Sequence, residues 1–284
     1  GMVSDVSNDD IVRLMVGREL QNRFNAMKEN VSNLAHDTVF EVRNVTSRDR
    51  KKVRDISFSV CRGEILGFAG LVGSGRTELM NCLFGVDKRA GGEIRLNGKD
   101  ISPRSPLDAV KKGMAYITES RRDNGFFPNF SIAQNMAISR SLKDGGYKGA
   151  MGLFHEVDEQ RTAENQRELL ALKCHSVNQN ITELSGGNQQ KVLISKWLCC
   201  RPEVIIFDEP TRGIDVGAKA EIYKVMRQLA DDGKVILMVS SELPEIITVC
   251  DRIAVFCEGR LTQILTNRDD MSEEEIMAWA LPQE

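Results

Sequence analysis

One stretch of this chain has the residue types and spacing needed to hold phosphate groups. Residues 70–77 read Gly-Leu-Val-Gly-Ser-Gly-Arg-Thr, between an apolar run at 64–69 and a segment with apolar residues at helical spacing at 78–84. A strand, a glycine-rich loop and a helix in this order are typical of a phosphate-binding loop. Glycines let backbone N–H groups turn toward phosphate oxygens, and the helix N-terminus favours anions. The residues expected to bind nucleotide phosphates are Gly70, Leu71, Val72, Gly73, Ser74, Gly75, Arg76, Thr77 and Glu78.

Two positions in this loop decide what chemistry it could support. Thr77 stands where the motif places a hydroxyl that binds Mg²⁺. Arg76 stands where the motif has lysine. Arginine keeps its charge but is planar and bulkier than the lysine ammonium, which fits between the β- and γ-phosphates. We therefore expect nucleotide binding to survive and hydrolysis to suffer, while a glycine-rich turn without a ligand is the alternative for this loop alone.

An acidic pair ends a second apolar run, at residues 204–208. A carboxylate at the end of a central strand, Asp208, can reach a Mg²⁺ held by Thr77. The adjacent Glu209 can act as a general base on water or position it. This pair predicts phosphoryl transfer to water, and the alternative is an acidic strand end that binds nothing.

A third stretch, residues 184–190, reads Leu-Ser-Gly-Gly-Asn-Gln-Gln and opens a predicted helix. A serine hydroxyl and free N–H groups at a helix start can bind an anion. Taken alone, this stretch would be an ordinary helix cap. Its occurrence with the loop and the acidic pair favours a second phosphate-binding element.

Composition and charge limit the classes of protein that fit this sequence. The 284 residues suit one large domain, or a domain with a subdomain and a tail. A formal net charge of −3 gives no electrostatic reason to expect a nucleic acid as the main partner. No apolar run approaches the roughly 20 residues of a membrane helix. The seven cysteines fit no zinc or redox spacing, so we expect reduced, buried thiols.

The elements that must position these motifs alternate along the chain. Strands are expected at 39–45, 53–60, 64–69, 91–98, 114–118, 204–208 and 235–239, with a hairpin at 251–265. Helices are expected at 78–84, 107–112, 131–142, 158–172, 188–200 and 218–231, with a terminal helix opened by a capping box at 272–275. This alternation predicts an α/β fold with a mostly parallel sheet covered on both faces. Strand patterns vanish over about 121–184, which indicates an inserted helical subdomain.

The three motifs together resemble those of ATP-binding-cassette (ABC) ATPases. The resemblance covers residues 37–284 and is carried by 70–77, 184–190 and 204–219, the last containing Asp-Glu-Pro-Thr-Arg-Gly-Ile-Asp-Val-Gly. The variants Gly-Arg-Thr and Gly-Gly-Asn-Gln-Gln are similar to the second cassette of tandem carbohydrate-importer ATPases. Residues 1–36 are expected to be a tail or linker, because 11–18 resembles the end of a first cassette. The resemblance implies a P-loop NTPase cassette with an antiparallel β subdomain and the inserted helical subdomain.

The resemblance also implies roles for individual residues. Two cassettes would sandwich two ATP molecules, each with Mg²⁺, and the signature of one cassette would face the nucleotide of the other. The signature residues acting in trans would be Ser185, Gly186, Gly187, Asn188 and Gln189, with Asp215 in the interface loop. Within the chain's own site, Glu209 would be catalytic, Ser241 would contact nucleotide, and Thr77, Asp208 and Glu119 would bind the metal.

Several positions depart from a fully active cassette of this family. Arg76 replaces lysine, Glu119 replaces a glutamine, and Ser241 replaces a histidine. No aromatic residue that could stack on adenine occurs between Thr46 and Arg54. We therefore expect one strong and one weak ATP site in the cassette pair, with the weak one on this chain.

The resemblance finally implies partners and a location. The partners would be the first cassette of the same polypeptide, transmembrane permease subunits and, indirectly, a periplasmic or lipoprotein sugar-binding protein, with no nucleic acid. The chain would lie peripherally on the cytoplasmic face of the cell membrane. Two alternatives stay open: a regulatory nucleotide-binding module that does not hydrolyse ATP, and a soluble ABC ATPase unrelated to transport. Phe126, Phe127 and Phe130 are expected in the subdomain core rather than on a partner.

Overall fold

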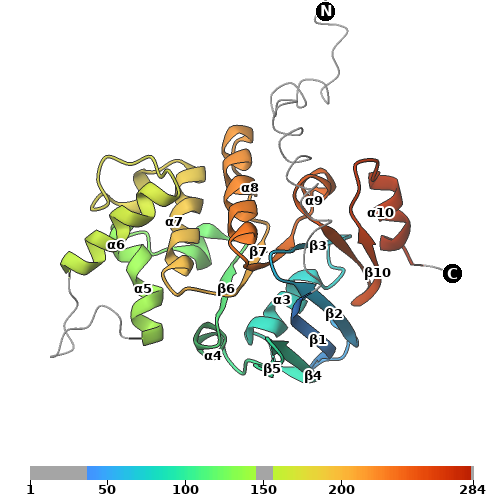
Figure 1. Cartoon of the computed structure of the whole chain (residues 1–284). Coiled ribbons are helices and arrows are strands. Elements are labelled where there is room, and N and C mark those ends of the chain that lie inside the picture. Colours follow the sequence, from blue (N-terminus) through green and yellow to red (C-terminus); the bar gives the residue numbers. More distant parts are fainter. Residues whose placement is uncertain (1–36, 145–155, 283–284) are drawn as a thin grey trace, which may run out of the picture.

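The computed structural model describes residues 37–144 and 156–282 (Figure 1). The tail or linker expected at 1–36 lies outside these described residues. The inserted helical subdomain lies at one end of the molecule, and β10 and α10 lie at the other (Figure 1). No helix within the described ranges has the length and apolar character needed to span a membrane.

A six-stranded sheet forms the centre of the fold. Its strand order is β10-β9-β3-β8-β7-β6, and only β10 runs antiparallel to its neighbour. The strands are β3 (Ile65–Gly70), β6 (Met114–Ile117), β7 (Val204–Asp208), β8 (Val235–Val239), β9 (Arg252–Cys257) and β10 (Arg260–Thr266). Every residue of β6, β7 and β8 is buried, as expected for parallel strands covered on both faces. The predicted mostly parallel sheet is confirmed.

The two faces of this sheet belong to different hydrophobic clusters. Leu66 and Phe68 of β3 point to one face, where they join α3 (Arg76–Phe84) and the antiparallel subdomain. Ile65 and Ala69 point to the other face. That face is covered by α8 (Val216–Asp231), α9 (Leu243–Val249) and α10 (Glu273–Ala280). Because successive side chains of β3 enter different hydrophobic clusters, the phosphate loop that follows this strand lies at the edge of both clusters.

The antiparallel subdomain is a four-stranded sheet in the order β2-β1-β4-β5. It consists of β1 (Thr38–Ser47), β2 (Ile56–Cys61), β4 (Arg89–Leu96) and β5 (Lys99–Asp100), and α4 (Pro106–Lys111) follows it. The predicted Asn97-Gly98 turn joins β4 to β5. The strand predicted at 53–60 begins three residues later, because Asp55 adopts a left-handed backbone with φ 56°.

The inserted subdomain is helical, as predicted, and has its own small core. Its elements are η3 (Arg121–Gly125), α5 (Ile132–Asp144), α6 (Glu156–Leu169), η4 (Ile181–Glu183) and α7 (Gly186–Leu198). Phe126 is buried in this core, but Phe127 and Phe130 are 47% and 37% exposed. The rings of Phe127 and Phe130 stack with centroids 5.2 Å apart. The core expectation is therefore wrong for two of the three phenylalanines.

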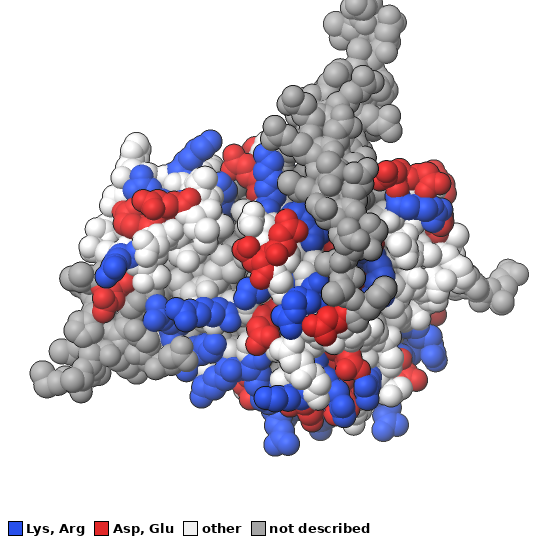
Figure 2. All heavy atoms as spheres, in the orientation of Figure 1, with Lys and Arg blue, Asp and Glu red and all other residues white. Residues whose placement is uncertain are grey.

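Acidic and basic side chains are interspersed over the face shown in Figure 2. The surface of the described residues carries ion pairs such as Arg268–Asp270, at 2.7 Å. A surface of mixed sign produces no single-sign field that would steer a strongly charged macromolecule to this face.

Lys196 on α7 is a buried cation, and this leads to a pH prediction. Its Nζ donates to the carbonyl of Gly125, and burial lowers the pKa of Lys196 to about 8 from the ordinary 10.5. The folded state therefore loses this proton first, so the contribution of Lys196 to the free energy of unfolding rises with pH through this window. Between pH values of about 7 and about 9.5 the gain should be about 1 to 2 kcal/mol.

The measurement is urea denaturation of the parent chain and Lys196→Met at both pH values. The free energy of unfolding of the parent, relative to that of Lys196→Met, should be larger at the higher pH. Lys99→Met removes an exposed lysine and is the control, for which the difference should stay constant. A Lys196→Met difference that is also constant would show that Lys196 keeps its ordinary pKa.

Candidate nucleotide-binding site

The predicted phosphate loop connects the end of β3 to the start of α3. Gly70 and Gly75 adopt φ values of 148° and 105°, which L side chains rarely adopt. A Cβ at Gly75 would lie 2.2 Å from the carbonyl oxygen of Lys52. The loop also receives a hydrogen bond from the β9–β10 turn, since the N–H of Gly259 donates to the Ser74 carbonyl at 2.7 Å. These contacts fix the loop backbone in a form that only glycine allows.

Arg76 lies beneath this loop rather than on its exposed side. The side chain is 7% exposed, and Nη1 donates to the carbonyl of Ser240 at 2.6 Å and to that of Phe68 at 3.5 Å. Burial lowers the pKa of Arg76, and the neighbouring carboxylates of Glu209 and Asp208 oppose that shift. The guanidinium therefore joins the carboxyl ends of β3 and β8, and its contact with phosphate stays a prediction.

The predicted metal pair of Thr77 and Asp208 is brought into contact. Thr77 Oγ1 donates to Asp208 Oδ1 at 3.2 Å, although 131 positions separate the two residues in the chain. The Asp208 side chain is buried, and desolvation raises its pKa. A hydroxyl and a carboxylate are oxygen ligands of the kind that Mg²⁺ takes, together with water and substrate phosphates. The residues present therefore fit a Mg²⁺ ion.

Tyr116 completes this carboxylate's surroundings, and sequence reasoning did not single it out. Its hydroxyl donates to Asp208 Oδ2 at 2.9 Å, and Asn81 Oδ1 lies 3.2 Å from the same hydroxyl. Burial and the Asp208 charge raise the pKa of Tyr116. A signal for this contact was available, since Tyr116 lies in a strand of four buried residues. A buried tyrosine hydroxyl usually finds a hydrogen-bond partner, so a polar residue was to be expected beside it.

Glu209 follows Asp208 in a backbone conformation that is unusual for glutamate. Its φ is 50°, and its N–H donates to the Val239 carbonyl at 2.9 Å. Such strained positions gather at functional sites. The carboxylate Oε2 accepts a hydrogen bond from Ser241 Oγ at 3.1 Å, and desolvation raises the pKa of Glu209. The structure thus joins the predicted catalytic residue to Ser241, a predicted nucleotide contact.

Two other predicted site residues, the metal ligand Glu119 and the nucleotide contact Glu78, have partners within the chain. Glu119 forms an ion pair with Arg212, so the structure joins only Thr77 and Asp208 of the three predicted metal ligands. Glu78 Oε1 pairs with Lys52 Nζ at 3.2 Å. The roles of Glu119 and Glu78 toward a nucleotide stay predictions.

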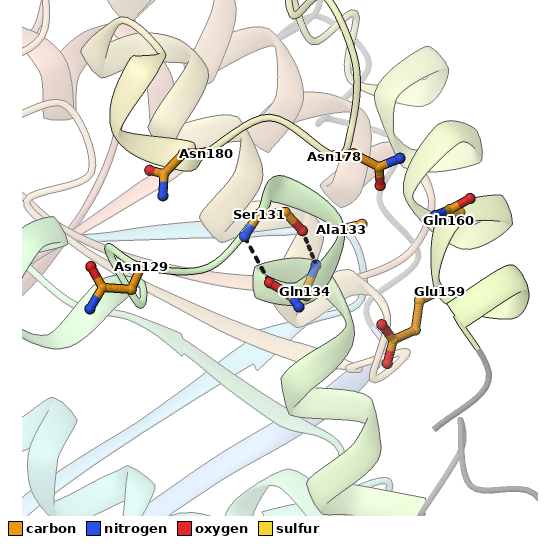
Figure 3. Close-up of a pocket in the computed structure, with 8 residues that line it drawn as sticks. All are labelled: Asn129, Ser131, Ala133, Gln134, Glu159, Gln160, Asn178 and Asn180. Atoms are coloured by element: carbon orange, nitrogen blue, oxygen red, sulfur yellow. Dashed lines mark hydrogen bonds between the residues drawn. The ribbon is translucent and has the colours of Figure 1, made fainter. Parts of the chain in front are cut away.

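Cavities are found both beside the antiparallel subdomain and in the helical subdomain. One, of about 380 Å³, borders the start of α3 and is lined by Ser47, Arg48, Asp49, Lys52, Glu78, Val86, Asp87 and Lys88. The other, of about 430 Å³, lies in the helical subdomain and has mostly amide and hydroxyl side chains around it (Figure 3). At its wall, Ser131 and Gln134 exchange hydrogen bonds of 3.0 and 3.2 Å, which fix the start of α5 (Figure 3).

The signature turn, Ser185–Gly187, opens α7. Ser185 is exposed and its Oγ accepts a hydrogen bond from Asn188 Nδ2 at 3.0 Å instead of capping the helix. Gln189 is buried, and its Nε2 donates to the Leu184 carbonyl at 3.1 Å. The exposed Ser185 at this helix N-terminus is therefore placed to meet an external anion. Asp215, the predicted interface residue, caps α8 by accepting from the Ala218 N–H at 3.0 Å.

Gly187 is required where α7 approaches α8, and this can be tested. A Cβ at Gly187 would lie 2.5 Å from the Ala218 Cβ. Gly187→Ala should therefore reduce the free energy of unfolding by about 1 to 3 kcal/mol, measured by chemical denaturation. Adding Ala218→Gly should recover part of the loss by removing the clash. Gly217→Ala meets only an ordinary contact of 3.4 Å and is the control; a similar loss there would contradict the steric argument.

Comparison with known proteins agrees with this geometry. A family model described as "ABC transporter" matches residues 53–212, more than half of the chain. A D-allose import ATP-binding protein, AlsA, of Escherichia coli is 99% identical over the whole chain, which covers 56% of that relative. A ribose import ATP-binding protein, RbsA, of Bacillus cereus is 43% identical over 98% of the chain and 54% of that relative.

A solved structure supports the fold. A nucleotide-free ATP-binding cassette from an ABC transporter matches with a TM-score of 0.73 at 20% identity, over 87% of this chain and all of that one. The chain spans about half the length of the curated relatives it matches. The match to the family model and the cassette fold agree with the site, in which Thr77 of the phosphate loop contacts Asp208 of the acidic pair. The chain belongs to the ABC transporter family as an ATP-binding cassette.

Proposed function

We propose that this chain binds and hydrolyses ATP to power sugar import, as the second cassette of a two-cassette subunit. The observation that carries the proposal is the contact between Thr77 Oγ1 and Asp208 Oδ1, with Glu209 next in the chain. The import of D-allose and of ribose in the names of the similar proteins supports a sugar as cargo. The coverage of about half of each relative leaves room for another cassette of similar size.

The residues of the site divide the work of phosphoryl transfer among themselves. Mg²⁺ would be held by Thr77 and Asp208 and would neutralise charge on the phosphate oxygens. Amide groups of the phosphate loop would hold the phosphates. Glu209 would accept a proton from water or orient it, and its raised pKa improves it as a base. Ser241 holds the Glu209 carboxylate in place.

The chain's own site is proposed to be the weaker of the two sites in the cassette pair. The Arg76 guanidinium is bonded to backbone carbonyls at the strand ends, so less of it is available for phosphate. The Glu119 carboxylate is paired with Arg212, which competes with a metal ion for it. The signature turn, with Ser185 exposed, would complete the other cassette's site, because its helix N-terminus can bind an anion.

Partners and location follow from the same proposal. The chain would lie peripherally at the cytoplasmic face of the membrane and drive transmembrane permease subunits. A sugar-binding protein would be served indirectly. Co-purification with permease subunits would separate this role from that of a soluble ABC ATPase.

A second candidate is a nucleotide-binding module that regulates without hydrolysis. The burial of Arg76 and its bonds to Ser240 and Phe68 favour this candidate. The raised pKa and strained backbone of Glu209 argue against it, since a purely regulatory site does not need a base.

The test is Mg²⁺-dependent ATP hydrolysis by this chain over a range of protein concentrations, with ATP binding titrated in parallel. Turnover that rises faster than linearly with concentration and disappears in Glu209→Gln would show that paired copies build a working site. ATP binding without turnover would support the regulatory candidate for the isolated chain. Absence of ATP binding would contradict both candidates.

A further inference from the structure

The segment that follows β6 is tied to two other loops, and Arg121 makes the two hydrogen bonds of this connection. Arg121 Nη1 donates to the Gly186 carbonyl at 2.8 Å, and Nη2 donates to the Gly213 carbonyl at 3.0 Å. Gly186 belongs to the signature turn, and Gly213 lies in the loop between β7 and α8. One planar side chain therefore joins loops that are 27 positions apart in sequence and 65 and 92 positions from Arg121.

Both carbonyls belong to glycines, and at Gly186 the guanidinium lies where a side chain would crowd it. A Cβ at Gly186 would lie 3.0 Å from Arg121 Nη1, and one at Gly213 would lie 3.4 Å from Nη2. Gly213 also has a φ of 67°, in the left-handed region. The rigid fork of arginine can serve two acceptors at once, whereas a lysine ammonium is a single compact donor.

Further contacts hold η3 along α7 and against the same loop. Glu119 pairs with Arg212, the neighbour of Gly213. At the other end of η3, the Gly125 carbonyl accepts from Lys196, and a Cβ at Gly125 would meet Leu193 at 2.8 Å. Residues 119–125 are therefore bound to the start of α7, to its last turn and to the loop at 212–213.

We propose that Arg121 is a positioning residue that holds the signature turn and the 211–215 loop in one fixed relation, so that both reach the partner cassette's nucleotide together. This proposal rests on the proposed function, in which Ser185 and Asp215 face that partner. Without Arg121 the Asp215 side chain would still cap α8 and Ser185 would still precede α7, but this guanidinium would no longer hold the two loops to each other. Misplacing a phosphate-binding group by about 1 Å can cost about 100-fold in rate.

The test compares variants of Arg121 in the two-cassette protein and in this chain. Arg121→Met should lower kcat for ATP about tenfold in the two-cassette protein and change KM by less than about twofold. Arg121→Lys should recover less than about half of the lost kcat, because it can serve one carbonyl only. Arg161→Met removes an exposed arginine of the same subdomain and should leave both constants unchanged. Thermal midpoints should stay close together, since the lost bonds are partly exposed.

Hydrogen–deuterium exchange on this chain gives an independent readout. Arg121→Met should speed amide exchange at 186–190 and at 211–215 together. If Arg121→Met does not fold, the same exchange measurement on Arg121→Lys tests the proposal. A kcat within about twofold of the parent, or faster exchange in only one of the two loops, would overturn the proposal. Ser185→Glu serves as the reference: if it abolishes turnover while Arg121→Met does not, only the positioning role has failed. If Ser185→Glu leaves turnover intact, the signature's action in trans has failed.

Discussion

Ser185→Glu in the two-cassette protein is expected to lower ATP turnover at saturating ATP by about 100-fold or more. Ser185 is exposed at the start of α7, and a carboxylate there would repel the phosphates of a nucleotide on the partner cassette. The fold should tolerate the change, because the Ser185 hydroxyl does not cap the helix and an acidic side chain suits a helix N-terminus. Steady-state phosphate release measures the effect.

A matched pair of variants makes this prediction specific. Ser59→Glu places the same charge on an exposed position of β2, in the antiparallel subdomain, and should leave turnover unchanged. Glu209→Gln alters the chain's own site and should lower total turnover by no more than about twofold if that site is the weak one. A Ser185→Glu protein that retains most of its turnover would show that the signature turn does not face phosphate.

Arg227→Met is expected to reduce the free energy of unfolding by about 3 to 5 kcal/mol, because it leaves a buried carboxylate without its cation. Arg227 Nη1 donates to both oxygens of Asp251, at 3.0 and 3.1 Å, and Nη2 donates to the Gly63 carbonyl at 2.7 Å. Asp251 Oδ2 also accepts from the Ile65 N–H at 2.8 Å. The pair thus fixes the start of β3, the strand that leads to the phosphate loop.

Chemical denaturation at two pH values tests this prediction and its cause. Burial raises the pKa of Asp251, and Arg227 opposes that shift, so removing the arginine should raise this pKa further. A carboxyl with a raised folded-state pKa destabilises the fold as pH rises, so the loss should be smaller at about pH 5 than at about pH 7. Asp231→Asn breaks only the exposed partner of Arg227 and should cost about 1 kcal/mol or less. An equal loss at both pH values would contradict the role of the Asp251 charge.

The central strands were predictable because strands buried on both faces consist of continuous apolar runs. Strands β7 and β8 have the predicted bounds, since short continuous apolar runs are typical of parallel strands buried on both faces. The terminal helix was predictable from its cap, and Ser272 Oγ does accept from the Glu275 N–H. Helix α9 was missed because it has seven residues and no capping side chain, although Pro244 marks its first turn.

The residues of the site were predictable from the sequence motifs, but the directions in which their side chains point were not. The contact of Thr77 with Asp208 followed from the motifs, because strand ends in a parallel sheet meet at one edge. The inward turn of Arg76 depends on the Ser240 carbonyl at the end of β8, and the ion pair of Glu119 depends on Arg212. Such choices between partners are made by tertiary packing, so no local pattern in the sequence reports them.

The contact between the phosphate loop and the β9–β10 turn has a consequence for synthesis on the ribosome. The loop occupies positions 70–77, but its Ser74 carbonyl is bonded by Gly259, and Arg76 is bonded to Ser240. At about 5 to 20 residues per second, those partners are made roughly ten to forty seconds after the loop itself. A nascent chain that ends before Ser240 and Gly259 therefore carries the loop sequence without the bonds that fix its backbone and the Arg76 side chain.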